Sequence, residues 1–209
     1  KTNIVKWDAG VFKPEARIAY DSENLYLLYK VKDESPWVNN GKDWQSLFKT
    51  GDSIDFQIGT DAGADPRRKS PAPGDIRLLI APFEDGNIAV LYRHKLKNGE
   101  KGNPVKFTSP WRSETVEDVR RLENAKIAVQ RNEGDYMVEA AIPLSDLGLK
   151  PGAGNYLADI GVIFGDNEGT VNLLRSYWSN KATGLVSDVP GEIMLSPDMW
   201  GRLKFEEGK

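Results

Sequence analysis

The stretch DSIDFQIG, residues 52–59, alternates apolar and polar side chains. Its apolar members Ile54, Phe56 and Ile58 lie two residues apart, and successive side chains of a β-strand point to opposite faces. The pattern therefore predicts a strand with one face in a core. The other face carries Asp55, so the same strand also predicts a polar surface on the far side of its sheet.

Nine further stretches have the composition of strands, because they are short, rich in β-branched and aromatic residues, and bounded by turn residues. They are residues 15–22, 24–33, 75–82, 87–95, 125–131, 135–143, 155–166, 171–178 and 201–207. Short strands at this regular spacing predict an all-β fold, an antiparallel β-sandwich of jelly-roll or immunoglobulin-like type. We take residues 1–209 as a single domain, with helix expected only over residues 113–125 and 143–148. Its long loops, which are usually functional or disordered, are residues 33–51, 60–74, 96–112 and 179–199.

Composition limits the function. The net charge of −3 gives no basic footprint for nucleic acid, and no apolar run reaches the roughly 18 to 20 residues that span a bilayer. The chain has no cysteine, which rules out thiolate nucleophiles and Cys-based metal sites. We predict no catalytic role for His94, because it has no second histidine or cysteine to work with. The chain starts at Lys1 and not at Met, which we interpret as the start of a processed chain or an excised domain.

Polar residues recur at mid-strand on the side away from the predicted core. They are Asp55, Gln57, Arg77, Glu139 and Asp159. An antiparallel sheet commonly leaves one face in water, and a solvated face is one interpretation. We assign apolar residues to the same side, namely Leu79, Leu91, Met137 and Ala141. A mixed face rimmed by long loops with aromatic residues is also typical of a ligand site.

Five segments, in this order, resemble those of the family 9 carbohydrate-binding modules. They are ARIAYDSENLYLLYKVKDESP (16–36), GDSIDFQIGTD (51–61), DYMVEAAIPLSDLGL (135–149), IFGDNEGTVNLLRSYWSN (163–180) and MWGRLKF (199–205). The third is the most specific, through its Glu-x-x-Ile-Pro signature. The resemblance implies a non-catalytic β-sandwich that binds oligo- or polysaccharide. It further implies a monomeric, secreted module, extracellular or periplasmic, within a larger polypeptide.

The resemblance also implies where the sugar binds. Family members hold it between two tryptophans, one from the loop before residues 51–61 and one from the end of the strand that closes the fourth segment. Carried over by position, the second is Trp178 and the first is Trp44, with Trp37 as the alternative. A pyranose packs its C–H groups against such rings, while its hydroxyls bond to polar side chains. The candidates for these bonds are Arg77, Asn180 and Asp55.

Neighbouring residues carry further predictions. Tyr177 and Trp178 are adjacent, so they cannot both enter one core. We predict that Tyr177 packs inward or at the sandwich edge and that Trp178 forms a wall of the site. Glu139 is expected to hold Arg77 or a loop backbone by charge-assisted hydrogen bonds. Trp111 is expected to anchor a loop.

Other interpretations remain open. Residues 59–68 and 165–170 combine carboxylates with glycines, so they are either polar turns or ligands of a structural calcium ion. A haem b-binding domain of the related DOMON type would use Met137 and His94. A glycoside hydrolase would need an acid and a base from among Asp55, Glu139 and Asp159. An interaction or spacer domain would have no sugar site.

Overall fold

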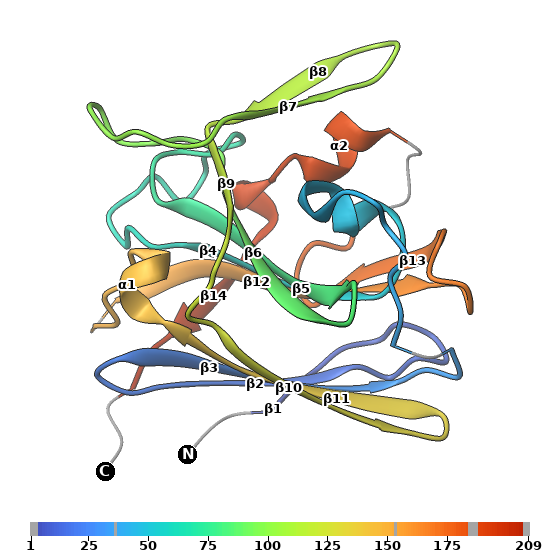
Figure 1. Cartoon of the computed structure of the whole chain (residues 1–209). Helices are drawn as coiled ribbons and strands as arrows, with labels where there is room; N and C mark the ends of the chain where they lie inside the picture. The colour runs from blue at the N-terminus through green and yellow to red at the C-terminus, as the bar shows by residue number, and fades with distance from the viewer. Residues whose placement is uncertain (1–3, 36, 153, 184–187, 207–209) are drawn as a thin grey trace.

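The computed structural model describes residues 4–35, 37–152, 154–183 and 188–206. Two antiparallel sheets lie one above the other (Figure 1). The smaller sheet has the strand order β1-β2-β3-β11-β10, and the larger has the order β13-β12-β4-β5-β6-β9, with β14 also paired to β12. The predicted all-β antiparallel sandwich is therefore confirmed.

The alternating stretches become the strands, and their bounds follow the sequence prediction closely. The smaller sheet contains β1 (Ile4–Lys6), β2 (Glu15–Tyr20), β3 (Asn24–Lys32), β11 (Asp135–Pro143) and β10 (Lys126–Asn132). The larger sheet contains β13 (Asn172–Tyr177), β12 (Asn155–Gly165), β4 (Ser53–Gly59), β5 (Asp75–Phe83), β6 (Gly86–Arg93), β9 (Asp118–Arg121) and β14 (Gly201–Lys204). A separate hairpin is formed by β7 (Val105–Thr108) and β8 (Ser113–Val116). The short helices are η1 (Trp44–Lys49), α1 (Leu144–Leu147), α2 (Val189–Ile193) and η2 (Pro197–Met199).

The described residues form two apolar cores. The first lies between the sheets and contains Ile54, Phe56 and Ile58, as predicted. The second lies on the outer face of the larger sheet, where η1, α2 and the β7–β8 hairpin cover it (Figure 1). Its buried members are Leu47, Phe48, Leu79, Ala81, Ile88, Val90, Tyr92, Phe107, Val116, Val119, Ile163 and Ile193. Three of the long loops therefore fold back onto the face that the sequence marks as polar.

Helix was predicted correctly at one of two places. The segment 143–148 contains α1, which is capped at its C-terminal end by Gly148 with φ of 63°, a left-handed conformation that glycine adopts freely. The helix predicted over residues 113–125 is wrong, because this segment forms β8 and β9. Val116 and Val119 are buried in the second core, and β-branched side chains of this kind suit strands better than helices. No helix within the described ranges is long and apolar enough to cross a membrane.

Candidate functional site

The structure joins two of the predicted sugar-binding residues. Asp55 and Arg77 stand on neighbouring strands β4 and β5, and the Arg77 Nε donates a hydrogen bond to the Asp55 Oδ2 at 2.8 Å. Both side chains are fully buried. The Arg77 guanidinium also lies 4.9 Å from the centre of the Phe48 ring and 5.8 Å from that of Tyr92. The pair is thus sealed inside the second core.

Trp44 lies on the same face of the larger sheet as this buried pair but does not open a site there. It begins η1, whose first turn is capped by the Asp43 carboxylate accepting a hydrogen bond from the Gln45 N–H. The Trp44 side chain is half-buried and packs against the second core. Helix α2 contacts η1 and closes the same face. A sugar therefore has no access to Asp55 and Arg77 in this conformation.

The other two predicted tryptophans lie on the opposite side of the larger sheet. Trp37 is only 1% exposed in the core between the sheets, 4.8 Å from the Tyr136 ring. Its Nε1 donates to the Asn87 Oδ1 at 2.8 Å, which satisfies the one polar atom that burial would leave unpaired. Trp37, the alternative to Trp44 as a sugar-stacking residue, is therefore not available to a ligand in this structure.

Tyr177 is buried on the edge strand β13, as predicted, whereas the prediction that Trp178 forms a wall of the site does not fit its packing. The Tyr177 hydroxyl donates to the Asp55 Oδ2, so Tyr177 is on the polar side of the sheet. Trp178 follows the end of β13 and packs on the core between the sheets. Its ring lies directly over Gly201, where a Cβ would come within 2.2 Å of the Trp178 Cζ3. The structure does not bring Trp178 and Trp44 together as two walls of one site.

Asn180 lies in the loop after β13, held by Asp159. The Asp159 carboxylate accepts hydrogen bonds from the backbone N–H groups of Ile160, Ser179 and Asn180. Burial raises the pKa of Asp159 to about 6. Asn180 also borders a recess of about 570 Å³ beside the β13 edge. Asp159 is thus a structural residue that positions Asn180 at this opening.

Glu139 does not contact Arg77, and that prediction is wrong. Glu139 is on β11 in the smaller sheet, with its side chain exposed on the outer face, whereas Arg77 belongs to the larger sheet. Alternation in the sequence shows that a side chain points away from the core, but it does not show to which sheet the strand belongs. The error arises from treating all polar mid-strand residues as one surface.

The geometry also bears on the alternative functions. Met137 is on the outer face of the smaller sheet and His94 is buried on the outer face of the larger one, so they do not face one haem. The His94 Nε2 donates to the Ile193 carbonyl oxygen at 2.8 Å. Glu139 lies on the other sheet from Asp55 and Asp159. Asp55 and Asp159 lie on neighbouring strands, but both are buried. Asp55 is bonded to Arg77 and Tyr177, and Asp159 to backbone N–H groups, so neither faces an open cleft as an acid or base.

The two loops that could be either polar turns or calcium ligands use their carboxylates within the chain. Asp61 and Asp65 accept hydrogen bonds from nearby backbone N–H groups, and Asp166 accepts from the backbone of Thr170 and Val171. Among the residues that the structure describes, no group of three or more His, Asp or Glu side chains is placed to hold a metal ion. These bonds are those of polar turns.

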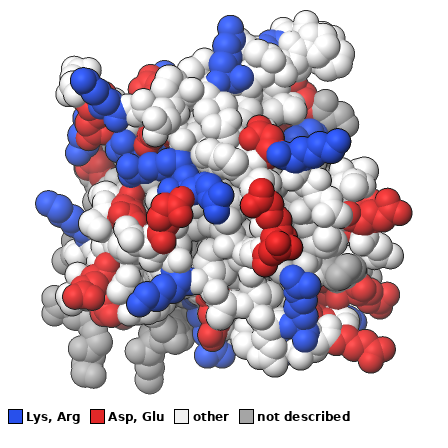
Figure 2. Space-filling view, in the orientation of Figure 1, with Lys and Arg blue, Asp and Glu red and all other residues white. Residues whose placement is uncertain are grey.

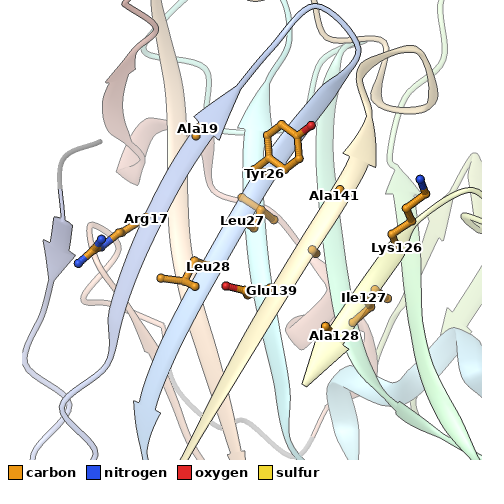
Figure 3. A pocket seen from close by; sticks show the side chains of 11 residues that line it. Arg17, Ala19, Tyr26, Leu27, Leu28, Lys126, Ile127, Ala128, Glu139 and Ala141 are labelled. Carbon is orange, nitrogen blue, oxygen red and sulfur yellow. The ribbon is translucent and has the colours of Figure 1, made fainter. Parts of the chain in front are cut away.

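An open hollow lies instead on the outer face of the smaller sheet (Figure 3). We call it the outer groove, and its volume is about 550 Å³. Two rows of directly opposed residues cross strands β2, β3, β11 and β10 here. They are Ala19, Tyr26, Ala141 and Lys126 in the first row, and Arg17, Leu28, Glu139 and Ala128 in the second.

Side-chain size explains the hollow. Ala19, Ala128 and Ala141 reach only one carbon from the backbone, so the longer side chains around them stand above an apolar floor. In Figure 3 the Tyr26 ring is seen nearly face-on, close to Ala19 and Ala141. Arg17, Lys126 and Glu139 are exposed around this floor. The groove therefore combines one aromatic face with charged hydrogen-bonding groups at its sides.

Tyr26 is held in a fixed position. Its ring is 38% exposed, and its hydroxyl donates a 2.7 Å hydrogen bond to the Asp21 Oδ2. This bond raises the pKa of Tyr26 and lowers that of Asp21, because it favours the neutral phenol and the ionised carboxylate. The Asp21 carboxylate also accepts from the Glu23 and Asn24 N–H groups in the β2–β3 turn. The turn thus orients the ring before any ligand binds.

No protein-family model and no curated protein matches this chain. Several solved structures resemble it. One is a family 9 carbohydrate-binding module from Caldicellulosiruptor kristjanssonii in complex with cellotriose, with a TM-score of 0.51 and 14% identity, over 100% of this chain and 84% of that one. The chain has the fold of a family 9 carbohydrate-binding module. A candidate carbohydrate-binding protein of Bacteroides uniformis matches with a TM-score of 0.50 and 15% identity, over 98% of this chain and 87% of that one.

Within the family 9 fold, two aromatic residues are exposed that the sequence analysis did not identify as exposed. Tyr26 alternates with the core residues Leu25 and Leu27, so the sequence indicates that its side chain points away from the core. The sequence does not show that its neighbours on the adjacent strands are the small residues Ala19 and Ala141. Trp111 is 80% exposed at the tip of the β7–β8 hairpin. The expectation that Trp111 anchors a loop is wrong, because its ring projects into solvent.

Charges on the family 9 fold are mixed. Figure 2 shows basic and acidic side chains interspersed over one face of the molecule, with no broad field of a single sign. This distribution agrees with the small net charge of −3. A phosphate backbone would need a continuous basic surface, and this face offers none.

Proposed function

We propose that this protein is a non-catalytic carbohydrate-binding module that holds a saccharide in the outer groove. The observation that carries the proposal is the Tyr26 ring, presented to solvent above a floor of alanines and flanked by Arg17 and Glu139. The family 9 fold supports the class of function. A fold alone does not define a function, so the groove supplies the argument.

The chemistry of the outer groove suits a sugar ring. The C–H groups on one face of a pyranose pack against Tyr26 and Leu28 as apolar surface. Equatorial hydroxyls at the ring edge donate to the Glu139 carboxylate and accept from Arg17 or Lys126. Bonds of this charge-assisted kind are stronger than neutral ones. One stacking contact with a few such bonds corresponds to binding in the millimolar to micromolar range, about −4 to −8 kcal/mol.

The volume and shape fit the same ligand. Ligand sites commonly enclose roughly 300 to 1,000 Å³, and the outer groove, at about 550 Å³, lies within that range. The groove is open along the sheet surface, so a longer chain would pass through it. We therefore propose binding to an oligo- or polysaccharide outside the cell or in the periplasm, by a module without catalytic residues of its own.

A glycan array on the purified chain tests the class of ligand. Isothermal titration with the best array ligand then compares wild type, Tyr26→Ala and Tyr26→Phe. We expect Tyr26→Ala to lower the affinity at least tenfold, while Tyr26→Phe retains most of it because the ring remains. Trp111→Ala is the matched control, since it removes an exposed aromatic ring outside the groove and should leave the affinity unchanged. Equal affinities of Tyr26→Ala and wild type would contradict the proposed site.

A further inference from the structure

The outer face of the smaller sheet carries more basic than acidic side chains. The strand register places eight charged residues on this face. They are the basic residues Lys6, Arg17, Lys30, Lys32 and Lys126 and the acidic residues Glu15, Asp135 and Glu139. The chain as a whole has a net charge of −3. This face is therefore positive on a protein that is negative overall.

Four of these charges compensate one another across neighbouring strands. The Lys6 Nζ donates a hydrogen bond to the Glu15 Oε1 at 2.7 Å. Lys32 stands directly opposite Asp135 on the adjacent strand, and opposite charges in such a cross-strand pair attract each other. These two pairs lie outside the outer groove, so they leave the charges around the groove unbalanced.

The other four charges surround the outer groove. Three are the cations Arg17, Lys30 and Lys126, and the fourth is the carboxylate of Glu139. Within the described ranges of the chain, none of the four takes part in an ion pair. Lys30 and Lys126 are diagonal neighbours of Glu139 on the two flanking strands, roughly 7 to 8 Å from it between Cα atoms. One carboxylate thus stands among three cations.

A further carboxylate, Asp21, stands at the end of the groove and is already engaged. It accepts hydrogen bonds from the Tyr26 hydroxyl and from the Glu23 and Asn24 N–H groups. Its oxygens are therefore used to hold the turn and the ring. Even with Asp21 included, the cations around the groove outnumber the carboxylates.

Two of the cations lie on opposite sides of the apolar floor. Arg17 on β2 and Lys126 on β10 both line the groove, with Glu139 on β11 between them (Figure 3). In the sheet order β10 is the third strand from β2, which corresponds to about 14 Å at a strand spacing of about 4.8 Å. A saccharide chain that crosses the strands therefore meets a cation on each side and a hydroxyl acceptor in the middle.

A uronic acid matches this arrangement better than a neutral sugar does. Its ring offers the same C–H face to Tyr26 and the same hydroxyls to Glu139, and it adds a carboxylate at the ring edge. The guanidinium of Arg17 can donate two parallel hydrogen bonds to such a carboxylate, and the ammonium of Lys126 supplies a point charge. A neutral sugar leaves both cations without a counter-charge.

We propose that the outer groove binds acidic saccharides, chains that contain uronic acid units, and that Arg17 and Lys126 select them. This inference rests on the proposed function, because it concerns the same groove and the same stacking on Tyr26. It goes further by naming the charge of the ligand, which the apolar floor does not determine.

Isothermal titration with two matched tetrasaccharides tests the inference. Tetraglucuronate and cellotetraose have the same linkage and differ only in the oxidation of C6 to a carboxylate. At low ionic strength we expect the wild-type protein to bind tetraglucuronate at least tenfold more tightly than cellotetraose. Raising the salt from about 0.01 M to about 1 M shortens the screening length from about 30 Å to about 3 Å. This change should remove most of the difference in affinity between the two ligands.

Charge variants of the groove identify the selecting residues. The double variant Arg17→Gln/Lys126→Gln should bind tetraglucuronate at least tenfold more weakly than wild type, and cellotetraose less than threefold more weakly. Glu139→Gln should strengthen tetraglucuronate binding at least threefold, because it removes a like charge, and should not strengthen cellotetraose binding. Lys97→Gln is the matched control, since it removes an exposed positive charge from the loop after β6 of the larger sheet, and it should behave as wild type.

The inference and the proposed function can fail separately. The inference is overturned if wild type binds tetraglucuronate no more tightly than cellotetraose, or binds neither, or if the double variant binds tetraglucuronate as tightly as wild type. Tyr26→Ala should weaken the binding of both ligands at least tenfold. Unchanged tetraglucuronate binding in Tyr26→Ala also overturns the inference, because the acid would then bind outside the groove. Equal binding of the two ligands that Tyr26→Ala abolishes would overturn the preference for acidic saccharides and leave the proposed function standing.

Discussion

Replacing Arg77 by methionine tests whether the outer face of the larger sheet is closed. The substitution removes the cation from the fully buried Asp55 and also removes the hydrogen bond to the Glu192 carbonyl oxygen. Methionine keeps much of the apolar bulk, so the cavity term stays small. Breaking a buried pair by removing one partner costs about 3 to 5 kcal/mol, because a buried charge is left uncompensated.

The loss is measured by urea unfolding, followed by tryptophan fluorescence. For a chain of this size, about 4 kcal/mol corresponds to a fall in Tm of roughly 8 to 16 °C. The double variant Asp55→Leu/Arg77→Met should recover much of the stability, since it leaves neither charge unpaired. Arg67→Ala is the control, because Arg67 pairs with Asp65 while its side chain is 91% exposed, and we expect no measurable change.

A loss below about 1 kcal/mol for Arg77→Met would refute this reasoning, since that is the range of solvent-exposed ion pairs. It would mean that water reaches Asp55 and Arg77, and that η1 and α2 do not seal the face in solution.

Two further stability predictions follow. Burial raises the pKa of Asp52 from 3.8 to about 7. The folded state therefore favours the protonated carboxyl group. The contribution of Asp52 to stability is greatest below pH 4 and is lost as the pH rises through 7. Between pH 4 and pH 7 the free energy of unfolding of wild type, relative to that of Asp52→Asn, should fall by up to about 4 kcal/mol. Urea unfolding at a series of pH values measures it. A difference between the two proteins that does not change with pH would contradict the prediction. Trp178→Ala should lower the free energy of unfolding by about 2 to 3 kcal/mol, somewhat less than for a fully buried tryptophan, because its ring packs on the core and over Gly201. A loss under 1 kcal/mol would place that ring in solvent instead.

The sandwich was predictable because its signal is local. Alternation in residues such as Ile54, Phe56 and Ile58 marks a strand and its core face with no knowledge of the partners. The β-branched residues Val116 and Val119 carried a similar signal within the segment expected to be helical, but the charged residues around them hid it.

The candidate site was less predictable, because it depends on contacts between distant segments. Nothing in the sequence around Phe48 or Ile193 shows that both fold onto the outer face of the larger sheet and bury Asp55 and Arg77. The apolar residue Leu79 on that face was the one indication that the face is covered, because the solvent-exposed face of a sheet rarely carries a leucine at its centre. The outer groove required the register of four strands, which alone brings Ala19 and Ala141 to either side of Tyr26.

The most direct test of the proposed function is the location of bound saccharide on the folded chain. Amide and methyl chemical shifts are followed by NMR during titration with the best ligand from the glycan array. We predict that the largest changes fall on Ala19, Tyr26 and Ala141 in the outer groove, while Trp44 and Trp178 change little. Largest changes at Trp44 and Trp178, with the groove unaffected, would contradict the proposal.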